Sequence, residues 1–346
     1  MIKNKRIFIT GGGGFIAVAL AEMLCENNEI VLYDIDFEHN AFSFSHLINN
    51  NKIALIKGDI LNLHELERVT RDSNIIIHMA ARVGVQEVIK DALNTLEVNY
   101  IGTSNILKAS SNSAACERVI VFSTSEIFGT NAFGIAENGD SLLSSVQDIR
   151  WCYCISKLAS EHLALSYYRQ KGLPVVVVRP FNVFGPKRVG DHVVLRFIIN
   201  ALRNEALEVY GDGTQIRAWC YIDDFCDALI RCMEIDGAVG QAFNIGNSRN
   251  TITIYELARR IVTLSGSKSN IVFKSADFKD IDIRVPNTTK ANDILGFVST
   301  TDLDEGLLRT IEWVKVNCSR LLADGYFSRQ RPGLRAVSGG HEKPCV

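Results

Sequence analysis

Short β-branched segments alternate with longer amphipathic segments through the first half of this chain, and this alternation limits the possible folds. We expect strands at residues 6–10, 29–34, 52–57, 74–80, 118–123 and 173–179. We expect helices near residues 15–27, 62–71, 91–111 and 153–171. Strand and helix in regular succession predict an α/β fold, in which a parallel sheet is covered by helices on both faces. Ligands of such sheets bind at the carboxyl ends of the strands, so the residues that follow each strand are candidate site residues.

The second half of the chain is less regular and predicts a smaller lobe. Its expected helices lie near residues 193–204, 254–265 and 303–316, with another that starts at 224, and its expected strands at 207–210, 217–222 and 241–246. Residues 129–150 show weak periodicity and are long for a connection, which is typical of a functional loop or lid. Residues beyond about 322 are rich in Gly, Arg and Ser without periodicity, so we expect a frayed tail there.

Composition excludes several classes of protein. Lys and Arg number 37 against 39 for Asp and Glu in 346 residues, a formal net charge of -2. Nucleic-acid-binding domains usually carry a basic excess, so we expect no nucleic-acid partner and expect a few placed residues to hold any anionic ligand. The longest apolar runs are strand-sized, which predicts no membrane span. The nine cysteines are scattered without zinc spacing, which is typical of reduced thiols in the cytoplasm and predicts no metal site.

A glycine cluster lies directly between the first expected strand and the first expected helix. Gly12, Gly14 and Ala17 fit G-x-G-x-x-G/A, and Gly11, Gly14 and Ala17 fit the related G-x-x-G-x-x-G with its last glycine replaced. Glycines at this point permit a tight turn and a close approach of backbone N–H groups to a pyrophosphate. The position of the cluster between a strand and a helix therefore favours a dinucleotide-binding loop over an ordinary glycine-rich turn.

Two carboxylates follow the next strands. Asp34 comes 20 residues after Gly14, at the end of the second expected strand. A carboxylate at that point accepts hydrogen bonds from the ribose hydroxyls and repels a 2′-phosphate, so NAD is favoured over NADP. Asp59, in the sequence Gly58-Asp59-Ile60, follows the third strand. It fits a contact with the adenine amine and an ordinary turn equally well.

Tyr153 and Lys157 lie four residues apart on one expected helix, so their side chains share a face. A tyrosine with a pKa of ~10 becomes a base at neutral pH only if the phenolate is stabilised by ~4 kcal/mol. The Lys157 ammonium and a positive nicotinamide ring are suitable sources. The alternative is a packed tyrosine beside a solvated lysine. Hydroxyls and a carboxylate in residues 123–126, at the end of the fifth expected strand, favour a reactive site.

Further motifs occur in order over about residues 5–318. They comprise residues 10–17, 78–81, 99–102, 123–129, 153–157, 179–182, 185–186 and 217–223. With these motifs the chain resembles the extended short-chain dehydrogenase/reductases of the NAD-dependent nucleotide-sugar epimerase/dehydratase family. The resemblance implies a Rossmann-type parallel sheet with helices on both faces and a smaller α/β C-terminal substrate lobe. It also implies a homodimer that forms through the helices near 91–111 and 153–171.

The resemblance further implies how the chain divides. We expect residues 1–180 to form an NAD-binding domain to which residues 217–250 return. Residues 181–216 and 251–320 are then expected to form the substrate-binding lobe, followed by a flexible tail at 323–346.

The motifs and the resemblance together assign site residues. Cofactor binding is assigned to Gly11, Gly14, Phe15, Ile16, Asp34, Asp59, Ile60, Ala80, Ala81, Asn99, Tyr153 and Lys157. Binding of a UDP-sugar is assigned to Arg82, Gly84, Asn182, Tyr210, Arg217 and Arg284, with residues 193–197 and 207–210 near the base. Catalysis is assigned to Thr124, Ser125, Glu126, Tyr153, Lys157 and Arg284. In this scheme Tyr153 removes the proton of the sugar C4 hydroxyl while hydride passes to NAD, and Thr124 binds the same oxygen.

The residues after Thr124 distinguish the subfamilies. Dehydratases of this family carry Asp-Glu there, whereas this chain has Ser125 and Glu126, which argues against a 4,6-dehydratase. Thr-Ser-Glu resembles UDP-glucuronate decarboxylases, as do Arg150-Trp151 and Arg284-x-Pro286. That resemblance implies that Arg284 and Ser125 bind the sugar carboxylate and that Glu126 delivers a proton to C5.

Simpler roles stay open for the same residues, since Glu126 fits a turn cap and Arg284 fits a phosphate ligand. Residues 82–85 instead resemble the epimerases, so a UDP-sugar C4 epimerase is the alternative to a decarboxylase. A ketosugar reductase and a non-catalytic NAD sensor are further alternatives.

Overall fold

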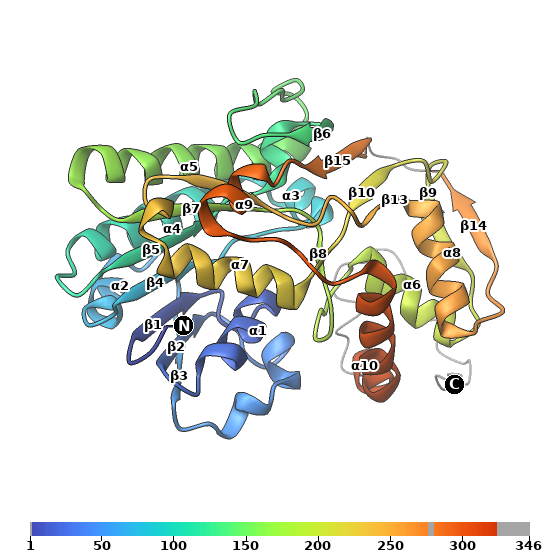
Figure 1. Ribbon diagram of the computed structural model, residues 1–346, viewed down its shortest axis with the longest axis horizontal. Coiled ribbons are helices and arrows are strands. Elements are labelled where there is room, and N and C mark those ends of the chain that lie inside the picture. Colours follow the sequence, from blue (N-terminus) through green and yellow to red (C-terminus); the bar gives the residue numbers. More distant parts are fainter. Residues whose placement is uncertain (1, 276–279, 324–346) are drawn as a thin grey trace.

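A seven-stranded parallel sheet forms the centre of the computed structural model, which describes residues 2–275 and 280–323. Its strand order is β12-β7-β5-β4-β1-β2-β3 (Figure 1). The strands are β1 (Arg6–Thr10), β2 (Glu29–Asp34), β3 (Ile53–Lys57), β4 (Ile75–His78), β5 (Arg118–Phe122), β7 (Val175–Pro180) and β12 (Ala242–Ile245). All seven correspond to strands expected from the sequence, and every neighbouring pair is parallel. The predicted α/β, Rossmann-type class is therefore confirmed.

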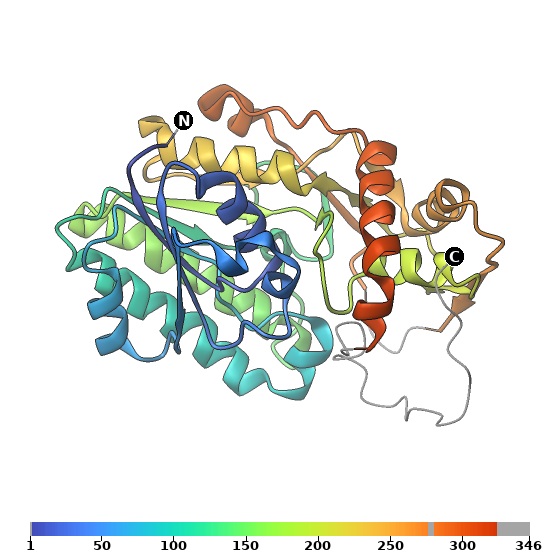
Figure 2. The same cartoon turned by 90° about the horizontal axis from the view of Figure 1, so that it is seen from below.

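Helices cover both faces of this sheet because successive strand side chains point to opposite faces. On β1, Ile7 and Ile9 belong to the core beneath α1 (Phe15–Leu24) and α7 (Ile222–Glu234). Phe8 belongs to the opposite core, beneath α2 (Leu63–Thr70) and α4 (Ala92–Ser111). The helix α5 (Cys152–Lys171) extends that second layer over β5 and β7 (Figures 1 and 2). Burial on both faces explains why the strands other than the edge strand β3 are almost continuously apolar.

A second lobe lies beside the carboxyl ends of the central strands (Figure 1). It contains a four-stranded sheet in the order β13-β10-β15-β6 and the pair β14-β9. These strands are β6 (Asn131–Ile135), β9 (Leu207–Tyr210), β10 (Ile216–Ala218), β13 (Thr251–Thr253), β14 (Ile271–Lys274) and β15 (Ile283–Pro286). The helices of the lobe are α6 (Val193–Leu202), α8 (Ile254–Ser265) and α10 (Leu303–Ala323).

The remaining elements are short. They are α3 (Val85–Lys90), α9 (Thr289–Leu295), the strand pair β8 (Val183–Phe184) and β11 (Cys220–Tyr221), and the 3₁₀ turns η1 (Ala41–Phe44), η2 (His46–Asn49), η3 (Ser125–Phe128), η4 (Ile149–Trp151) and η5 (Asp236–Ala238). No helix in the described part of the chain combines the length and apolar content that crossing a membrane requires.

Two sequence expectations about local structure were wrong. The strand expected at 217–222 is two strands, β10 and β11, separated by Trp219, and α7 begins already at Ile222. The segment 129–150, expected as a loop or lid, contains β6, which pairs in parallel with β15. That partner strand begins about 150 residues later in the chain, so local periodicity carries no signal of the pairing.

The division into domains stays a prediction, to which strand pairing adds three facts. The strand β12, within 217–250, belongs to the central sheet. By contrast β10, which overlaps the start of that range, and β6, which lies within 1–180, belong to the second sheet. The expected tail at 323–346 lies outside the described residues except for Ala323.

Candidate active site

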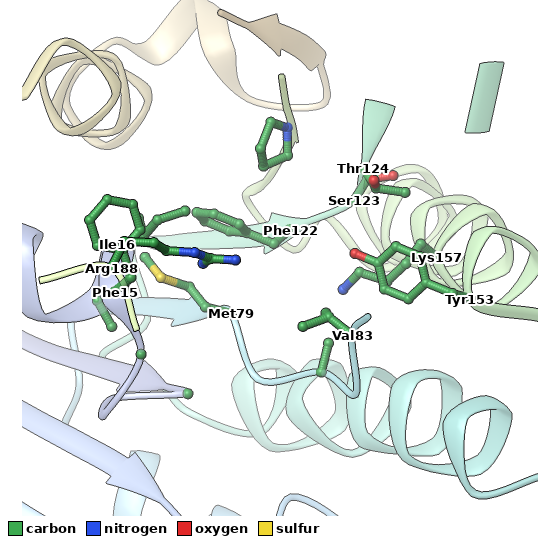
Figure 3. A pocket seen from close by; sticks show the side chains of 15 residues that line it. Phe15, Ile16, Met79, Val83, Phe122, Ser123, Thr124, Tyr153, Lys157 and Arg188 are labelled. Atoms are coloured by element: carbon green, nitrogen blue, oxygen red, sulfur yellow. The ribbon is translucent and has the colours of Figure 1, made fainter. Parts of the chain in front are cut away.

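A pocket opens at the carboxyl ends of β1, β4, β5 and β7, where the sequence placed its candidate residues (Figure 3). Its lining consists of Gly11, Gly14, Phe15, Ile16, Ala17, Met79, Ala81, Val83, Phe122, Ser123, Thr124, Tyr153, Lys157, Pro180 and Arg188. The glycine loop and the Tyr153/Lys157 pair, far apart in the chain, thus face one cavity.

The glycine loop has room for backbone only. Gly11 has a φ of +69°, and a Cβ atom there would lie 2.8 Å from the backbone nitrogen of Ala80. A Cβ atom on Gly12 would lie 2.7 Å from the side chain of Leu32. Gly14 is the N-cap of α1 and offers no side chain to the first turn. The N-terminus of α1 therefore meets the pocket without a side chain in front of it, which fits a pyrophosphate.

Asp34 holds the far side of this loop. Its Oδ2 accepts a hydrogen bond from the Gly13 backbone N–H at 2.9 Å, and its Oδ1 accepts one from Asp36 N at 3.3 Å. Burial raises the pKa of Asp34 above its ordinary value, while the backbone N–H donors lower it. A carboxylate beside the loop at the end of β2 is placed as a ribose ligand requires. The glycine cradle and Asp34 therefore fit NAD.

A buried hydrogen-bond network supports the floor of the loop. His78 lies between Thr10 Oγ1, 2.8 Å from its Nδ1, and Thr103 Oγ1, 3.1 Å from its Nε2. Thr103 donates its own proton to Asn99 O, so the network is satisfied with the proton on His78 Nε2. Burial and the nearby charge of Lys157 lower the pKa of His78 to about 3. His78 is therefore neutral and structural.

Tyr153 and Lys157 project from α5 toward the pocket (Figure 3). Lys157 is 2% exposed, and burial lowers its pKa to about 8. Burial, followed by the negative charge of Glu126, raises the pKa of Tyr153, and a hydrogen bond with Thr124 lowers it. In the protein alone, burial is therefore the largest influence on the pKa of Tyr153. The expectation that Lys157 and a bound nicotinamide ring together lower this pKa stays a prediction.

Arginines gather at the other end of the site, next to the 3₁₀ turn η3. Arg284 is 3% exposed and donates to Ser125 Oγ at 3.3 Å and to Gly129 O at 2.7 Å. Burial lowers the pKa of Arg284 to about 10, with Glu126 as the main opposing influence. The structure therefore brings together Arg284 and Ser125, which the sequence assigned to one role, although they are 159 positions apart in the chain.

Two more buried arginines lie beside them. Arg217 Nη2 is 3.2 Å from Asp280 Oδ1, and Arg150 Nη2 is 4.0 Å from the same oxygen. Both guanidinium groups influence the pKa of Arg284, which places the three cations close together. Such a cluster is suited to a substrate with several negative charges.

Several residues that the sequence assigned to ligand binding are absent from the pocket lining given above and contact other residues near the site instead. Asn99 accepts from Arg82 N at 2.8 Å and donates to Ser156 Oγ at 3.0 Å, which fixes the segment after β4 to α5. The Arg82 guanidinium pairs with Glu87 at 3.3 Å, and Gly84 is the N-cap of α3 with a φ of 107°. Their predicted roles as ligand contacts stay predictions.

The nucleotide-side candidates lie in the second lobe and around the third strand. Asn182 donates to Ala218 O at 3.2 Å, and the Arg196 guanidinium lies 5.3 Å from the ring centroid of Tyr210. Asp59 Oδ1 accepts a hydrogen bond from Leu61 N at 2.9 Å. This bond fits the role of Asp59 in an ordinary turn. Ile60 is buried in the core. The contacts predicted for these residues with adenine and with the sugar nucleotide stay predictions.

Sequence reasoning missed three residues of the site. Ser123 lines the pocket, and its hydroxyl is buried without a partner among the described residues. Its place at the end of β5 was an available signal. Arg188 enters the pocket directly after the Gly185-Pro186 motif, where two adjacent basic residues suggest a solvated turn. Arg150 was noticed as part of a motif but was given no role.

The lowered pKa of Lys157 predicts how stability depends on pH. Charged Lys157 is disfavoured in the folded protein, a cost that is complete below pH 8 and disappears as pH rises past 10.5, the ordinary value. Without added nucleotide, the free energy of unfolding of the wild type minus that of Lys157→Met should rise by about 3 kcal/mol between pH 7 and pH 10.5. Urea unfolding at each pH measures this difference. A constant difference would show that Lys157 titrates as in water.

Comparisons with known proteins agree with this geometry. Residues 7–246 match the model of the NAD dependent epimerase/dehydratase family. The chain is 34% identical over 321 residues to the UDP-N-acetyl-alpha-D-glucosaminuronate decarboxylase of Bacillus cytotoxicus, covering 90% of this chain and 98% of the relative. It is 35% identical over 312 residues to UDP-glucuronic acid decarboxylase 3 of Arabidopsis thaliana, covering 88% and 87%.

Solved structures give the same result. The structure of UDP-glucuronic acid 4-epimerase from Bacillus cereus in complex with UDP-glucuronic acid and NAD superimposes with a TM-score of 0.82, at 26% identity, over 90% of this chain and 99% of that one. Within residues 2–275 and 280–323, no group of three His, Cys, Asp or Glu side chains is arranged to hold a metal ion. The family match, the relatives and the NAD-bound structure together show that the cofactor is NAD and that the chain belongs to the NAD dependent epimerase/dehydratase family of enzymes.

Proposed function

We propose that this enzyme decarboxylates a UDP-linked hexuronate, using NAD that is reduced and reoxidised within one catalytic cycle. The relatives named above act on UDP-glucuronate or its 2-acetamido counterpart, as their names state. Both sugars carry the C6 carboxylate that the reaction removes, so they are the substrates to test first. Action in the cytoplasm stays a prediction from the cysteine pattern.

The single observation that carries this proposal is the contact of Arg284 with Ser125 beside Glu126. Arg284 Nη1 lies 3.3 Å from Ser125 Oγ, and both residues are at least nine-tenths buried. A buried guanidinium and hydroxyl form a site for a carboxylate, since the charge-assisted hydrogen bonds replace lost hydration. Ser125 and Glu126 directly follow Thr124, which hydrogen-bonds with Tyr153. The carboxylate would therefore be held close to the carbon that is oxidised.

The first step is oxidation at C4. Tyr153 removes the proton of the C4 hydroxyl, and Thr124 holds the same oxygen by a hydrogen bond. When bound, NAD accepts the C4 hydride, and its positive nicotinamide ring favours the phenolate of Tyr153. Lys157, on the same face of α5, is positioned to add a positive charge close to that oxygen. These influences must offset the rise in the Tyr153 pKa that burial causes.

The second step is loss of CO₂. After oxidation the C6 carboxylate is β to the C4 ketone, so the electrons of the C5–C6 bond can pass to the ketone oxygen as an enolate. Arg284 and Ser125 hold the carboxylate before the bond breaks, and Glu126 supplies the proton to C5. Tyr153 would return its proton to the C4 oxygen when the ketone is reduced again, so the cycle would end without net oxidation of the sugar.

The cation cluster also suits the diphosphate. Arg217 is 8% exposed, and its partner Asp280 is 34% exposed at the side chain. A guanidinium in this position can form bidentate bonds to phosphate oxygens. We therefore assign the diphosphate to Arg217 and Asn182, and the carboxylate to Arg284.

A UDP-glucuronate C4 epimerase is the second candidate. The similarity to the Bacillus cereus 4-epimerase structure supports it, since that enzyme binds the same class of sugar. Both reactions share the oxidation at C4. The decarboxylase then breaks the C5–C6 bond, whereas the epimerase keeps that bond and receives the hydride on the other face of C4. Product mass separates them, because epimerisation leaves the mass unchanged. Net change in NADH absorbance during steady turnover would instead indicate a reductase.

The first test combines product analysis with loss of the proposed base. Wild-type protein with NAD should convert UDP-glucuronate, or its 2-acetamido counterpart, with release of CO₂ detected by mass spectrometry. Tyr153→Phe should reduce this rate by roughly 10²- to 10⁴-fold and retain NADH binding, because only the proton acceptor is lost. Tyr168→Phe, at an exposed position of the same helix, is the matched control. An active Tyr153→Phe enzyme would reject the proposed base.

The second test separates a carboxylate ligand from a phosphate ligand. Arg284→Met should weaken binding of UDP-glucuronate relative to UDP-glucose by roughly 10- to 100-fold, because a charge-assisted hydrogen bond is lost. Binding of UDP should stay close to wild type. Arg217→Met should weaken all three ligands alike. Calorimetric titration measures these affinities, and an equal loss for all ligands in Arg284→Met would assign Arg284 to the diphosphate instead.

We also propose a homodimer that forms through α4 and α5, which pack on each other. Apolar side chains on these helices are exposed to solvent, including Leu93 at 68%, Ile101 at 43% and Ile155 at 39%. Exposed apolar side chains grouped on adjacent helices favour association.

Light scattering coupled to size-exclusion chromatography should therefore show a dimer for the wild type. Ile101→Glu should shift the population toward monomer, because a carboxylate would be buried at the interface. Val316→Glu, at an exposed apolar position on α10, should not. A monomeric wild type would contradict the proposal.

A further inference from the structure

Arg188 is a partly buried cation that the mechanism above does not use. Its guanidinium extends into the pocket from the side opposite Tyr153 and Lys157 (Figure 3). Its Nε is buried without a hydrogen-bond partner, and no residue of the described ranges forms an ion pair with it. Burial lowers the pKa of Arg188 below its ordinary value. A guanidinium that is partly removed from water and has no counter-charge is costly, which indicates an anionic ligand at this position.

The surroundings of Arg188 indicate which anion. Its guanidinium lies 5.6 Å from the ring centroid of Phe15, the first residue of α1. Phe15 directly follows Gly14, so Arg188 is close to the N-terminus of α1 and to the glycine cradle. The arginines assigned to the substrate, by contrast, gather around η3 and β15.

The backbone next to Arg188 is held in an unfavourable conformation by an ion pair. Lys187 has a φ of 69°, in the left-handed region that residues other than glycine rarely adopt. Its amino group pairs with Glu22 of α1. Glu22 also accepts from Ser45 Oγ at 2.6 Å and lies 3.3 Å from His46 Nδ1, so three chain segments meet at this carboxylate. Its side chain is 15% exposed, which protects the pair from solvent screening.

We propose that Arg188 binds the pyrophosphate of NAD, and that the Lys187–Glu22 ion pair is a clasp that holds Arg188 against the cofactor. Attachment of Lys187 to the outside of α1 determines the backbone of the next residue and so presents Arg188 to the pocket. In this arrangement the N-terminus of α1 faces the cofactor, and Glu22 on the same helix forms the ion pair of the clasp. Arg188 is a binding residue, whereas Lys187 and Glu22 are positioning residues.

The clasp gives the enzyme a way to retain its cofactor. An enzyme that oxidises and then reduces the same sugar must keep NADH bound between the two hydride transfers. A cation fixed over the pyrophosphate slows dissociation of the oxidised and the reduced cofactor alike, since both carry this group. The inference rests on the family's cofactor and not on the sugar assigned under the proposed function.

NADH release tests the binding role without any sugar substrate. The protein is loaded with NADH and mixed with excess NAD, and the fluorescence of bound NADH is followed as it decays. Arg188→Gln should release NADH roughly 10- to 100-fold faster, because a charge-assisted contact is lost. Arg188→Lys, which keeps the charge, should lie between this variant and the wild type. Arg203→Gln, whose arginine pairs with Glu205 at the end of α6, is the matched control.

A double-mutant cycle tests the positioning role. Glu22→Gln alone should speed NADH release severalfold and should have no further effect when Arg188→Gln is already present. Unfolding midpoints establish that each variant is folded. Wild-type release of NADH from folded Arg188→Gln would overturn the assignment of Arg188, as would a loss of UDP affinity in place of NADH affinity. Additive effects of the two substitutions would overturn the clasp.

Discussion

The pairing of β1 with β2 on one side and β4 on the other determines where the site of this protein lies. Chain order reverses at this point of the sheet, so the connections after β1 and β4 diverge and leave a crevice at the carboxyl ends of the strands. The glycine loop follows β1 directly, and its backbone approaches Ala80, which follows β4, so closely that no side chain fits between them. The backbone of the loop is therefore free to meet the cofactor, and every other part of the site is placed around this crevice.

Cations that are buried or partly buried are the second common feature of the site. Lys157, Arg188, Arg217 and Arg284 all have a pKa that burial lowers. Such groups cost stability in the protein alone, and anionic ligands offset the cost when they bind. The arrangement explains how a chain with a net charge of -2 is suited to NAD and to the UDP-sugar that we propose as its substrate, each of which carries a diphosphate. The positive charge is concentrated at the site, so the net charge of the whole chain does not reveal it.

Particular elements show what could be predicted from the sequence. Six of the seven central strands could be predicted because their burial on both faces leaves almost continuous apolar segments, whereas the edge strand β3 has no buried residue. The pair of Tyr153 and Lys157 could be predicted because residues four positions apart on a helix share one face. The strand β6 was missed, since it lies at an edge of its sheet with Phe133 75% exposed and pairs with a strand distant in the chain. Arg188 was missed because two adjacent basic residues after a turn are usually solvated.

The sequence by itself determined the fold class, the family and the NAD loop, because each depends on local spacing within a strand, a turn or one helix. The tertiary structure alone decided which distant groups meet, such as Arg284 with Ser125 or Lys187 with Glu22. It also decided that burial raises the pKa of Tyr153 in the protein alone, a rise that residue spacing does not predict. The physical reason is the same in each case. Desolvation and long-range contacts depend on what surrounds a side chain in space, and residue spacing along the chain does not contain that information.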